Sequence, residues 1–136
     1  MESVDKVRIC PSDLLGEERL RQKLTSYSLN GYLSTEAKPK FENVRKLKAT
    51  SKTIVAFETA EQKGVDLFAD HLHSFNWYRV SNIKKGIVFD AIKAEVQVDR
   101  HLGAAHYLYA DGHVDLINEE QIHTWAHQPW NFALPQ

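Results

Sequence analysis

The sequence is poor in cysteine, in long apolar runs and in net charge, and each shortage narrows the range of functions. Its single cysteine, Cys10, excludes an internal disulfide and a four-cysteine zinc cluster, and we interpret it as a small, buried or half-buried thiol. No segment approaches the roughly 18 to 20 apolar residues that cross a bilayer, and residues 1–13 contain no signal-peptide core. The net charge of −1 gives no reason to expect binding to nucleic acid or to an anionic membrane. We therefore expect a soluble chain without a targeting signal.

The residues that are present fit one globular domain. A chain of 136 residues is long enough for one hydrophobic core and too short for two ordinary domains, so we expect a single domain over residues 1–136. Hydrophobic residues make up 43% and charged residues 26%, close to the globular average. Helical patterns mixed with several short strand patterns predict an α+β fold with a small antiparallel sheet. Function must then come from a site or a surface.

The clearest local signal is Asp111-Gly112, which lies between two runs of alternating side chains and predicts a β-hairpin over residues 105–117. A tight turn needs positive φ, which glycine adopts freely and aspartate tolerates. With a two-residue loop, Ala110 pairs with His113, and Tyr109 pairs with Val114. Alternation then assigns to the core-facing side Tyr107, Tyr109, Val114 and Leu116, and to the opposite side His106, Leu108, Ala110, His113, Asp115 and Ile117.

Upstream of the hairpin, the patterns predict a short helix and three further strands. Ser12 or Asp13 is a candidate N-cap for a charged helix through residues 16–24. Residues 53–59 are β-branched and aromatic and predict a strand inside the sheet. Two more short strands are expected at residues 87–89 and 94–98.

The remaining segments are expected to be loops and a C-terminal helix. Asn30-Gly31 predicts a turn, and residues 67–80 a long structured loop. The lysine-rich stretch 34–52 predicts a solvated loop with an edge element, or alternatively a basic docking patch. After the hairpin, Asn118 is an N-cap for a helix that ends before Pro129, and the aromatic tail should pack back on the domain.

Seven histidines make a metal site or a metal-dependent hydrolase the first chemical hypothesis, because neutral imidazole is the commonest protein ligand of zinc. His71-Leu72-His73 followed by Ser81 resembles the start of the JAMM metalloprotease pattern, with Glu58 upstream as a base. That pattern requires an aspartate ligand where this chain has Lys84, and the positive charge argues against such an enzyme. In an extended segment His71 and His73 point the same way, which suits either a shared metal or an exposed polar face.

A second candidate metal set consists of His101, Asp111 and His113, with Asp99, Glu58 or Asp115 as helpers. Asp111 and His113 flank the turn, whereas His101 lies roughly 30 Å away along a straight strand, so a shared ion requires a bend or a neighbouring strand. The structural alternative is that His101 hydrogen-bonds a loop and Asp111 builds the turn. No nucleophile elbow, glycine-rich phosphate loop or base next to Cys10 is visible, so we assign no catalytic residue.

The same hairpin also carries a family resemblance. His101, nine residues and then Asp111-Gly112 resemble the H-X9-DG signature of the prepilin-type-processing-associated domain family. Further similar pieces follow in the family's order, namely RICPSD at 8–13, SYSLNGYL at 26–33, TIVAFET at 53–59 and the tail 119–136. The resemblance covers most of the chain, but only residues 100–114 are specific. Where the family usually has asparagine before its Tyr-Leu-Phe/Tyr segment, this chain has His106.

The resemblance implies the globular head of a type IV pilin-like or type II secretion pseudopilin-like protein. Such proteins join a β-rich head, presented outside the inner membrane, to a leader and a long apolar helix that anchors and polymerises. This sequence lacks that helix, so we expect the head alone or a helix-free relative. The resemblance thus predicts a non-enzymatic, extracytoplasmic structural or interaction domain without a cofactor. Its expected partners are pilin-like subunits or secretion-system proteins, with membrane contact only through the absent helix.

Overall fold

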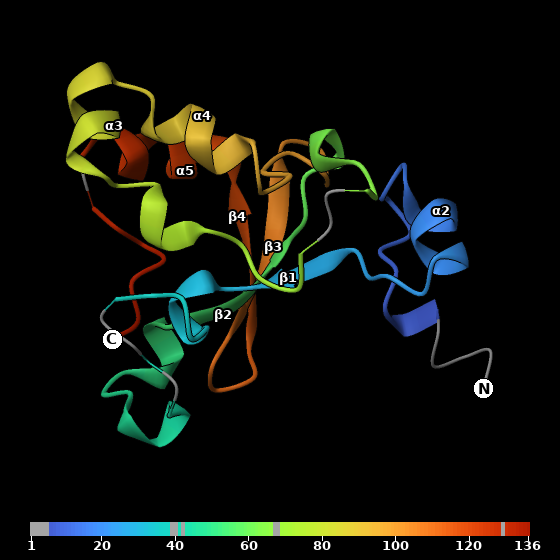
Figure 1. Ribbon diagram of the computed structural model, residues 1–136, viewed down its shortest axis with the longest axis horizontal. Coiled ribbons are helices and arrows are strands. Elements are labelled where there is room, and N and C mark those ends of the chain that lie inside the picture. Colours follow the sequence, from blue (N-terminus) through green and yellow to red (C-terminus); the bar gives the residue numbers. More distant parts are fainter. Residues whose placement is uncertain (1–5, 39–40, 42, 67–68, 129) are drawn as a thin grey trace.

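The computed structural model of the chain describes residues 6–38, 41, 43–66, 69–128 and 130–136. Its centre is a single antiparallel sheet with the strand order β1-β2-β3-β4. The strands are β1 (Tyr27–Leu29), β2 (Ile54–Glu58), β3 (Ala104–Tyr109) and β4 (Val114–Asn118) (Figure 1). The predicted α+β class and the placement of residues 53–59 inside the sheet are therefore confirmed.

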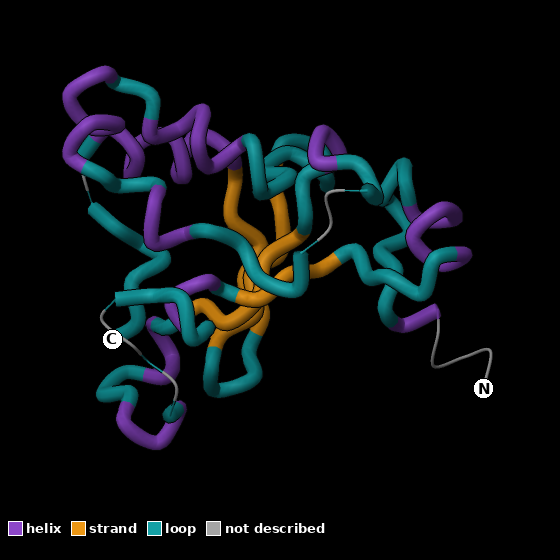
Figure 2. Tube along the Cα trace, viewed as in Figure 1, coloured by secondary structure: helices purple, strands orange, loops and turns teal. Residues whose placement is uncertain are grey.

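The helices are short and gather mainly on one side of the sheet. They are α2 (Gly16–Arg21), α3 (Val80–Lys85), α4 (Val88–Lys93) and α5 (Glu119–His127). Helices α3, α4 and α5 lie together, while α2 and residues 6–15 before it lie at another side of the molecule (Figure 1). Single 3₁₀ turns interrupt the long loops of Figure 2; they are η1 (Gly31–Leu33), η2 (Val44–Lys46), η3 (Thr50–Lys52), η4 (Glu61–Lys63) and η5 (Ser74–Asn76). Within the described ranges, no helix has the length and hydrophobicity needed to cross a bilayer.

The hydrophobic core lies between the sheet and the helices α4 and α5. Phe57 of β2 is at its centre, with edge-on ring contacts to Trp77, Tyr107 and Phe132 at centroid distances of 5.5, 5.8 and 6.4 Å. Helix α5 contributes Ile122, which is fully buried in the same cluster. Phe132 belongs to the C-terminal tail, so the tail packs back on the domain as predicted.

The hairpin is present where the sequence predicts it, but the predicted register is wrong by one residue. Leu108 rather than Tyr109 pairs with Val114. The loop has three residues, because the Tyr109 amide donates to the carbonyl oxygen of His113 at 2.9 Å. Gly112 adopts φ 92 and donates its amide to the Tyr109 carbonyl oxygen at 2.9 Å, as a left-handed glycine does in a three-residue hairpin loop.

The register shift changes which side chains face the core. Tyr107 and Tyr109 are buried as predicted. Val114 and Leu116, predicted to face the core, instead lie on the other side of the sheet and are 54% and 59% exposed. Asp115 takes the side shared with Tyr107, its cross-strand partner.

Other segments also depart from the prediction. Residues 87–89 and 94–98 do not form two strands. Helix α4 occupies Val88–Lys93, and the second segment is reduced to an isolated antiparallel bridge between Val96 and Thr59. Val88 and Ile92 of α4 are both buried, and their spacing of four residues is helical, a period that the alternation pattern obscured. The helix expected over residues 16–24 ends at Arg21. The segment predicted as a long loop contains η5 and the start of α3, while residues 67–68 lie outside the described part.

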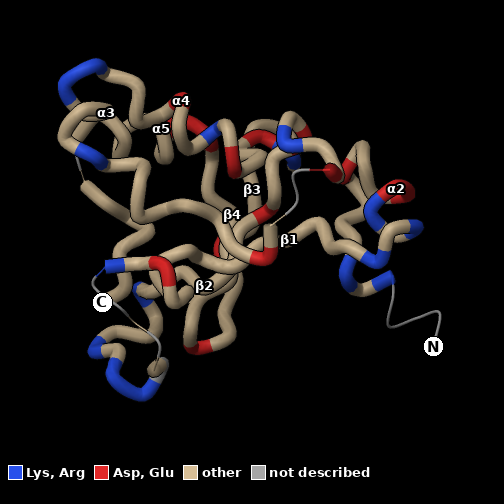
Figure 3. Tube along the Cα trace, viewed as in Figure 1, with Lys and Arg blue, Asp and Glu red and all other residues tan. Residues whose placement is uncertain are grey.

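The lysine-rich stretch forms no edge strand in its described residues; it carries η2 and η3 on a loop at one end of the molecule, where basic residues gather (Figure 3). Helix α5 begins as predicted, with the Asn118 side chain accepting the Gln121 amide at 2.8 Å, and ends at His127, before Pro129.

Candidate functional site

The motif residues Arg100 and His101 lie just before β3, next to the end of β2. The Arg100 side chain is completely buried, and its Nη2 donates to the carbonyl oxygen of Thr59 at 2.8 Å. Three carboxylates surround the guanidinium: Asp13 at 3.5 Å, Glu61 at 3.7 Å and Glu58 at 3.9 Å. Burying a charge requires such compensation, so Arg100 ties the N-terminal segment to the sheet.

His101 contacts the same carboxylate that faces Arg100. Its Nε2 is 2.9 Å from Oε1 of Glu58, and the other oxygen of Glu58 accepts the His106 amide at 2.8 Å. The Cys10 sulfur lies 3.6 Å from the same His101 nitrogen. His101 therefore has the structural hydrogen bond that we expected as one alternative, although its partner is a strand carboxylate rather than a loop.

This cluster does not have the geometry of a cysteine nucleophile with its base. In such a site one imidazole nitrogen faces the thiol and the other is held by the acid. Here Cys10 and Glu58 approach the same nitrogen, Nε2 of His101. Burial also raises the pKa of Cys10, which is only 3% exposed, so the reactive thiolate is disfavoured.

The network extends through a second buried arginine. Arg19 of α2 donates to Asp13 at 2.8 Å, with both side chains inaccessible to solvent. Burial would raise the pKa of Asp13, but hydrogen bonds from Ser26 and the Leu15 amide, together with Arg100 and Arg19, lower it. Our sequence reasoning missed both arginines; the position of Arg100 directly before the motif histidine was the available signal.

The structure does not bring together the second candidate metal set, which consists of His101, Asp111 and His113. His101 lies before β3 and Asp111 and His113 lie beyond it, so the strand's six residues, roughly 20 Å, separate them. Among the described residues, the two clusters of potential metal ligands are Cys10/Glu58/His101 and Glu36/His71/His73, and neither contains Asp111 or His113.

Asp111, Gly112 and His113 serve the hairpin turn instead. Asp111 accepts the His113 amide at 3.1 Å and also contacts its ring. The amide hydrogen bond lowers the pKa of Asp111, and the contact with Asp111 raises the pKa of His113. The His113 ring also stacks on Tyr109 at a centroid distance of 4.3 Å. These contacts fix the turn, as the structural alternative for Asp111 expected.

The side of the sheet opposite the helices carries an apolar surface that the sequence did not reveal. One cross-strand row runs over all four strands as Leu29, Ala56, Leu108 and Val114. Leu116 lies beside it, opposite His106. We call this surface, formed by Leu29, Ala56, Leu108, Val114 and Leu116, the open face. A hollow of about 380 Å³ lies over it, lined by Tyr27, Ala56, Phe57, His106, Leu108 and Val114.

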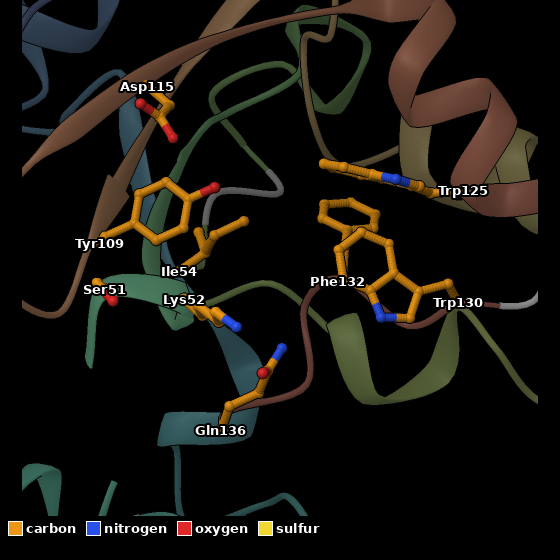
Figure 4. A pocket seen from close by; sticks show the side chains of 9 residues that line it. All are labelled: Ser51, Lys52, Ile54, Tyr109, Asp115, Trp125, Trp130, Phe132 and Gln136. Atoms are coloured by element: carbon orange, nitrogen blue, oxygen red, sulfur yellow. The ribbon is translucent and has the colours of Figure 1, made fainter. Parts of the chain in front are cut away.

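A second hollow of about 380 Å³ lies at the margin of the core. Trp125, Trp130 and Phe132 stand together on one side of it, across from Tyr109 (Figure 4). Trp130 is 46% exposed, whereas Trp77 is a core residue at 1%. No family model, curated protein or solved structure matches the chain.

Proposed function

We propose that this chain is a non-enzymatic, pilin-like head domain that docks an apolar partner through the open face. The observation that carries the proposal is the orientation of β4, which turns Val114 and Leu116 to solvent and Asp115 toward the side of Tyr107. A strand with one face in water normally does the opposite. An outward apolar row in a four-stranded sheet supports a protein-binding surface.

The open face is large enough to contribute substantially to binding. Leu29, Leu108, Val114 and Leu116 are between 38% and 59% exposed. Complete burial of such a side chain contributes about 1.5 to 3 kcal/mol, so covering the exposed parts of four of them contributes roughly 3 to 6 kcal/mol before the costs of association. The open-face residues themselves carry no charge that a partner would have to neutralise.

The occupant we propose is an apolar helix of a pilin-like subunit or secretion-system protein. The family that the hairpin motif resembles joins such heads to long apolar helices. An apolar helix fits the open face, because its five residues are uncharged and Glu58, on the same side of the sheet, is buried at 1% exposure. This assignment also gives the domain an extracytoplasmic location, in the periplasm or on the cell surface. A hydrolase with a cysteine nucleophile is less well supported, because Cys10, Glu58 and His101 lack the order of contacts that such a nucleophile requires. The metal-dependent alternative loses one of its two ligand sets, because His101 is separated from Asp111 and His113 by β3.

Site-specific photo-crosslinking in the cells that make the protein tests this function. A benzophenone side chain replaces Leu116 on the open face. In a matched variant it replaces Ile83, which is 40% exposed and belongs to α3, one of the helices that gather on the other side of the sheet (Figure 1). We expect a crosslink from position 116 to an apolar helical peptide of a pilin-like or secretion protein, identified by mass spectrometry. The companion substitutions Leu108→Ser and Val114→Thr should weaken that crosslink without changing the melting temperature by more than a few degrees.

Two results would contradict the proposal. One is a yield at position 116 no higher than at position 83, which would mean that the open face stays in water. The other is a crosslink confined to polar, non-helical segments, which would remove the proposed occupant.

A further inference from the structure

A second group of side chains lies at the outer edge of β1, the edge that faces away from β2, and apart from the open face. Residues 70–72 run along this edge, with the Leu29 amide donating to the Asp70 carbonyl oxygen and the Leu72 amide to the Leu29 carbonyl oxygen, both at 2.8 Å. Leu72 is fully buried. His71 and His73, the neighbours of Leu72 in the sequence, therefore project from the same side of this extended segment. Their ring centroids are 5.6 Å apart.

Both imidazoles are oriented by carboxylates behind them. Nδ1 of His71 is 2.7 Å from Asp70, and Nδ1 of His73 is 3.1 Å from Glu95. Glu95 is itself fixed, since it accepts the Trp77 indole N–H at 2.7 Å. Carboxylates on Nδ1 are the usual outer partners of histidines that bind metal through Nε2, because they fix the tautomer and raise the basicity of the ligand atom.

The Nε2 atoms of both histidines face a third carboxylate, Glu36. Oε2 of Glu36 lies 3.4 Å from Nε2 of His71 and 4.0 Å from Nε2 of His73. Two atoms bonded to zinc at about 2.0 Å lie about 3.3 Å apart across a tetrahedral angle, so only small movements are needed. Nε2 of His71 is buried from solvent, and among the described residues the acceptor that faces it is Glu36 at 3.4 Å, without the geometry of a full hydrogen bond. A cation between the two atoms would satisfy both of them.

The backbone brings Glu36 to the histidines through Gly31. A Cβ atom at Gly31 would lie 1.9 Å from the carbonyl oxygen of Leu72, so only glycine allows η1 to approach the histidine segment this closely. Ser34 continues the turn by donating to the Gly31 carbonyl oxygen at 2.6 Å and accepting the Glu36 amide at 3.3 Å. The chain thus folds back and places the Glu36 carboxylate opposite the Nε2 atoms of His71 and His73.

We propose that Glu36, His71 and His73 bind a divalent transition metal ion of the zinc class, with the fourth coordination position open to solvent. Two imidazoles and one carboxylate are a ligand set that zinc accepts in proteins. The groups around the site carry a net charge of −2. Glu36, Asp70 and Glu95 contribute three carboxylates, and the Lys63 ammonium lies 3.4 Å from Glu95. A divalent ion neutralises this charge. The ion would clamp the turn after η1 to the edge of β1.

The other cluster of potential ligands is a poorer metal site. In Cys10/Glu58/His101 the histidine nitrogen is already 2.9 Å from the carboxylate, and the Arg100 guanidinium lies 3.9 Å from the same oxygen. The buried positive charge of Arg100 opposes a second cation at this point. The Glu36 cluster, in contrast, has two imidazoles that Asp70 and Glu95 orient.

Calorimetric titration of the chelator-treated chain with zinc chloride tests the proposal. We expect one zinc ion per chain, and at least 100-fold weaker binding after the double substitution His71→Ala/His73→Ala. The matched control is His123→Ala/His127→Ala, which removes another neighbouring pair of histidines, with rings 4.1 Å apart on α5, and should leave the affinity unchanged. Circular dichroism establishes that each variant is folded.

Glu36→Gln provides a test that does not depend on the histidines, because Glu36 is 57% exposed and its replacement should leave the fold intact. It should weaken zinc binding at least tenfold, and Asp70→Asn, which alters the outer partner of His71, by about tenfold. Absence of zinc binding to the wild-type chain would overturn the proposal. So would equal loss of binding in the two double variants, or unchanged affinity in Glu36→Gln.

Discussion

Replacing Arg100 by methionine should reveal how far the buried charge network determines stability. Methionine keeps an apolar stem of similar length, so the change removes the guanidinium with a minimal cavity. Glu58 would then lie 1% exposed without its cationic neighbour, whereas Asp13 would keep Arg19 at 2.8 Å. Breaking a buried ion pair on one side costs about 3 to 5 kcal/mol, and the retained Arg19 contact places the expected loss near 3 kcal/mol.

Equilibrium unfolding in urea measures this loss. With a denaturant dependence of about 2 kcal/mol per molar, a loss of about 3 kcal/mol lowers the midpoint by about 1.5 M. The matched control is Arg21→Met, since Arg21 is 72% exposed and pairs with Glu18 at 2.9 Å. An exposed pair of this kind contributes about 0 to 1 kcal/mol, so the control midpoint should fall by less than about 0.5 M.

A double-mutant cycle separates the charge interaction from other effects. Glu58→Gln removes the negative charge while keeping the shape, and in the Arg100→Met background it should cost less than in the wild type. The difference is the coupling free energy, which we expect between about 0.5 and 3 kcal/mol. A midpoint for Arg100→Met equal to that of Arg21→Met, together with zero coupling, would refute the structural role assigned to the motif arginine.

Three further predictions concern the hairpin and the buried polar side chains. Asn30 is fully buried, and its side chain makes hydrogen bonds to four groups. Asn30→Ala should therefore lower the free energy of unfolding, measured in urea, by about 3 kcal/mol or more. The control Asn43→Ala, at an exposed position, should lower it by less than about 1 kcal/mol. Gly112→Ala puts a side chain at φ 92 and should lower stability by about 1 to 2 kcal/mol, seen as a lower melting temperature; an unchanged temperature would contradict the turn geometry. Asp111→Asn should lower the pKa of His113 toward its ordinary 6.5, measured by NMR titration of the ring. Because the folded pKa of Asp111 is lowered from 3.8 and that of His113 is raised from 6.5, the pair stabilises the turn fully between these values; its contribution is lost as the pH falls through the folded pKa of Asp111 or rises through that of His113.

The local part of the fold was predictable because short-range chemistry determines it. Asn118 caps α5 through the Gln121 amide, and the uncharged run before Glu58 forms the inner strand β2. The hairpin register was not predictable from the same signals. Asp111-Gly112 suits a two-residue loop and a three-residue loop equally well, and the apolar pattern favoured the wrong one because Val114 and Leu116 face solvent.

Neither cluster of potential metal ligands could be assembled from spacing alone. Glu58 and His101 are 43 residues apart, and Cys10 and His101 are 91 residues apart. The pairing of β2 with β3 brings Glu58 and His101 together, and Cys10 joins them because its amide donates to the Ser26 hydroxyl beside β1 at 2.9 Å. The spacing of His71 and His73 did predict that they share one side, but Glu36 joins them through the close approach of Gly31 to another backbone, which no local pattern encodes.

The position of β4 at the edge of the sheet bears on the solubility of the domain. Its outer backbone groups have no strand partner among the described residues, so a second copy could add its own β4 there. The antiparallel pairing that best matches apolar side chains would set Val114 of each copy against Leu116 of the other. That register places the two Asp115 carboxylates directly opposite each other, and like charges in that position repel. The charge of Asp115 therefore disfavours edge-to-edge pairing of β4 in the register that would join its exposed valine and leucine.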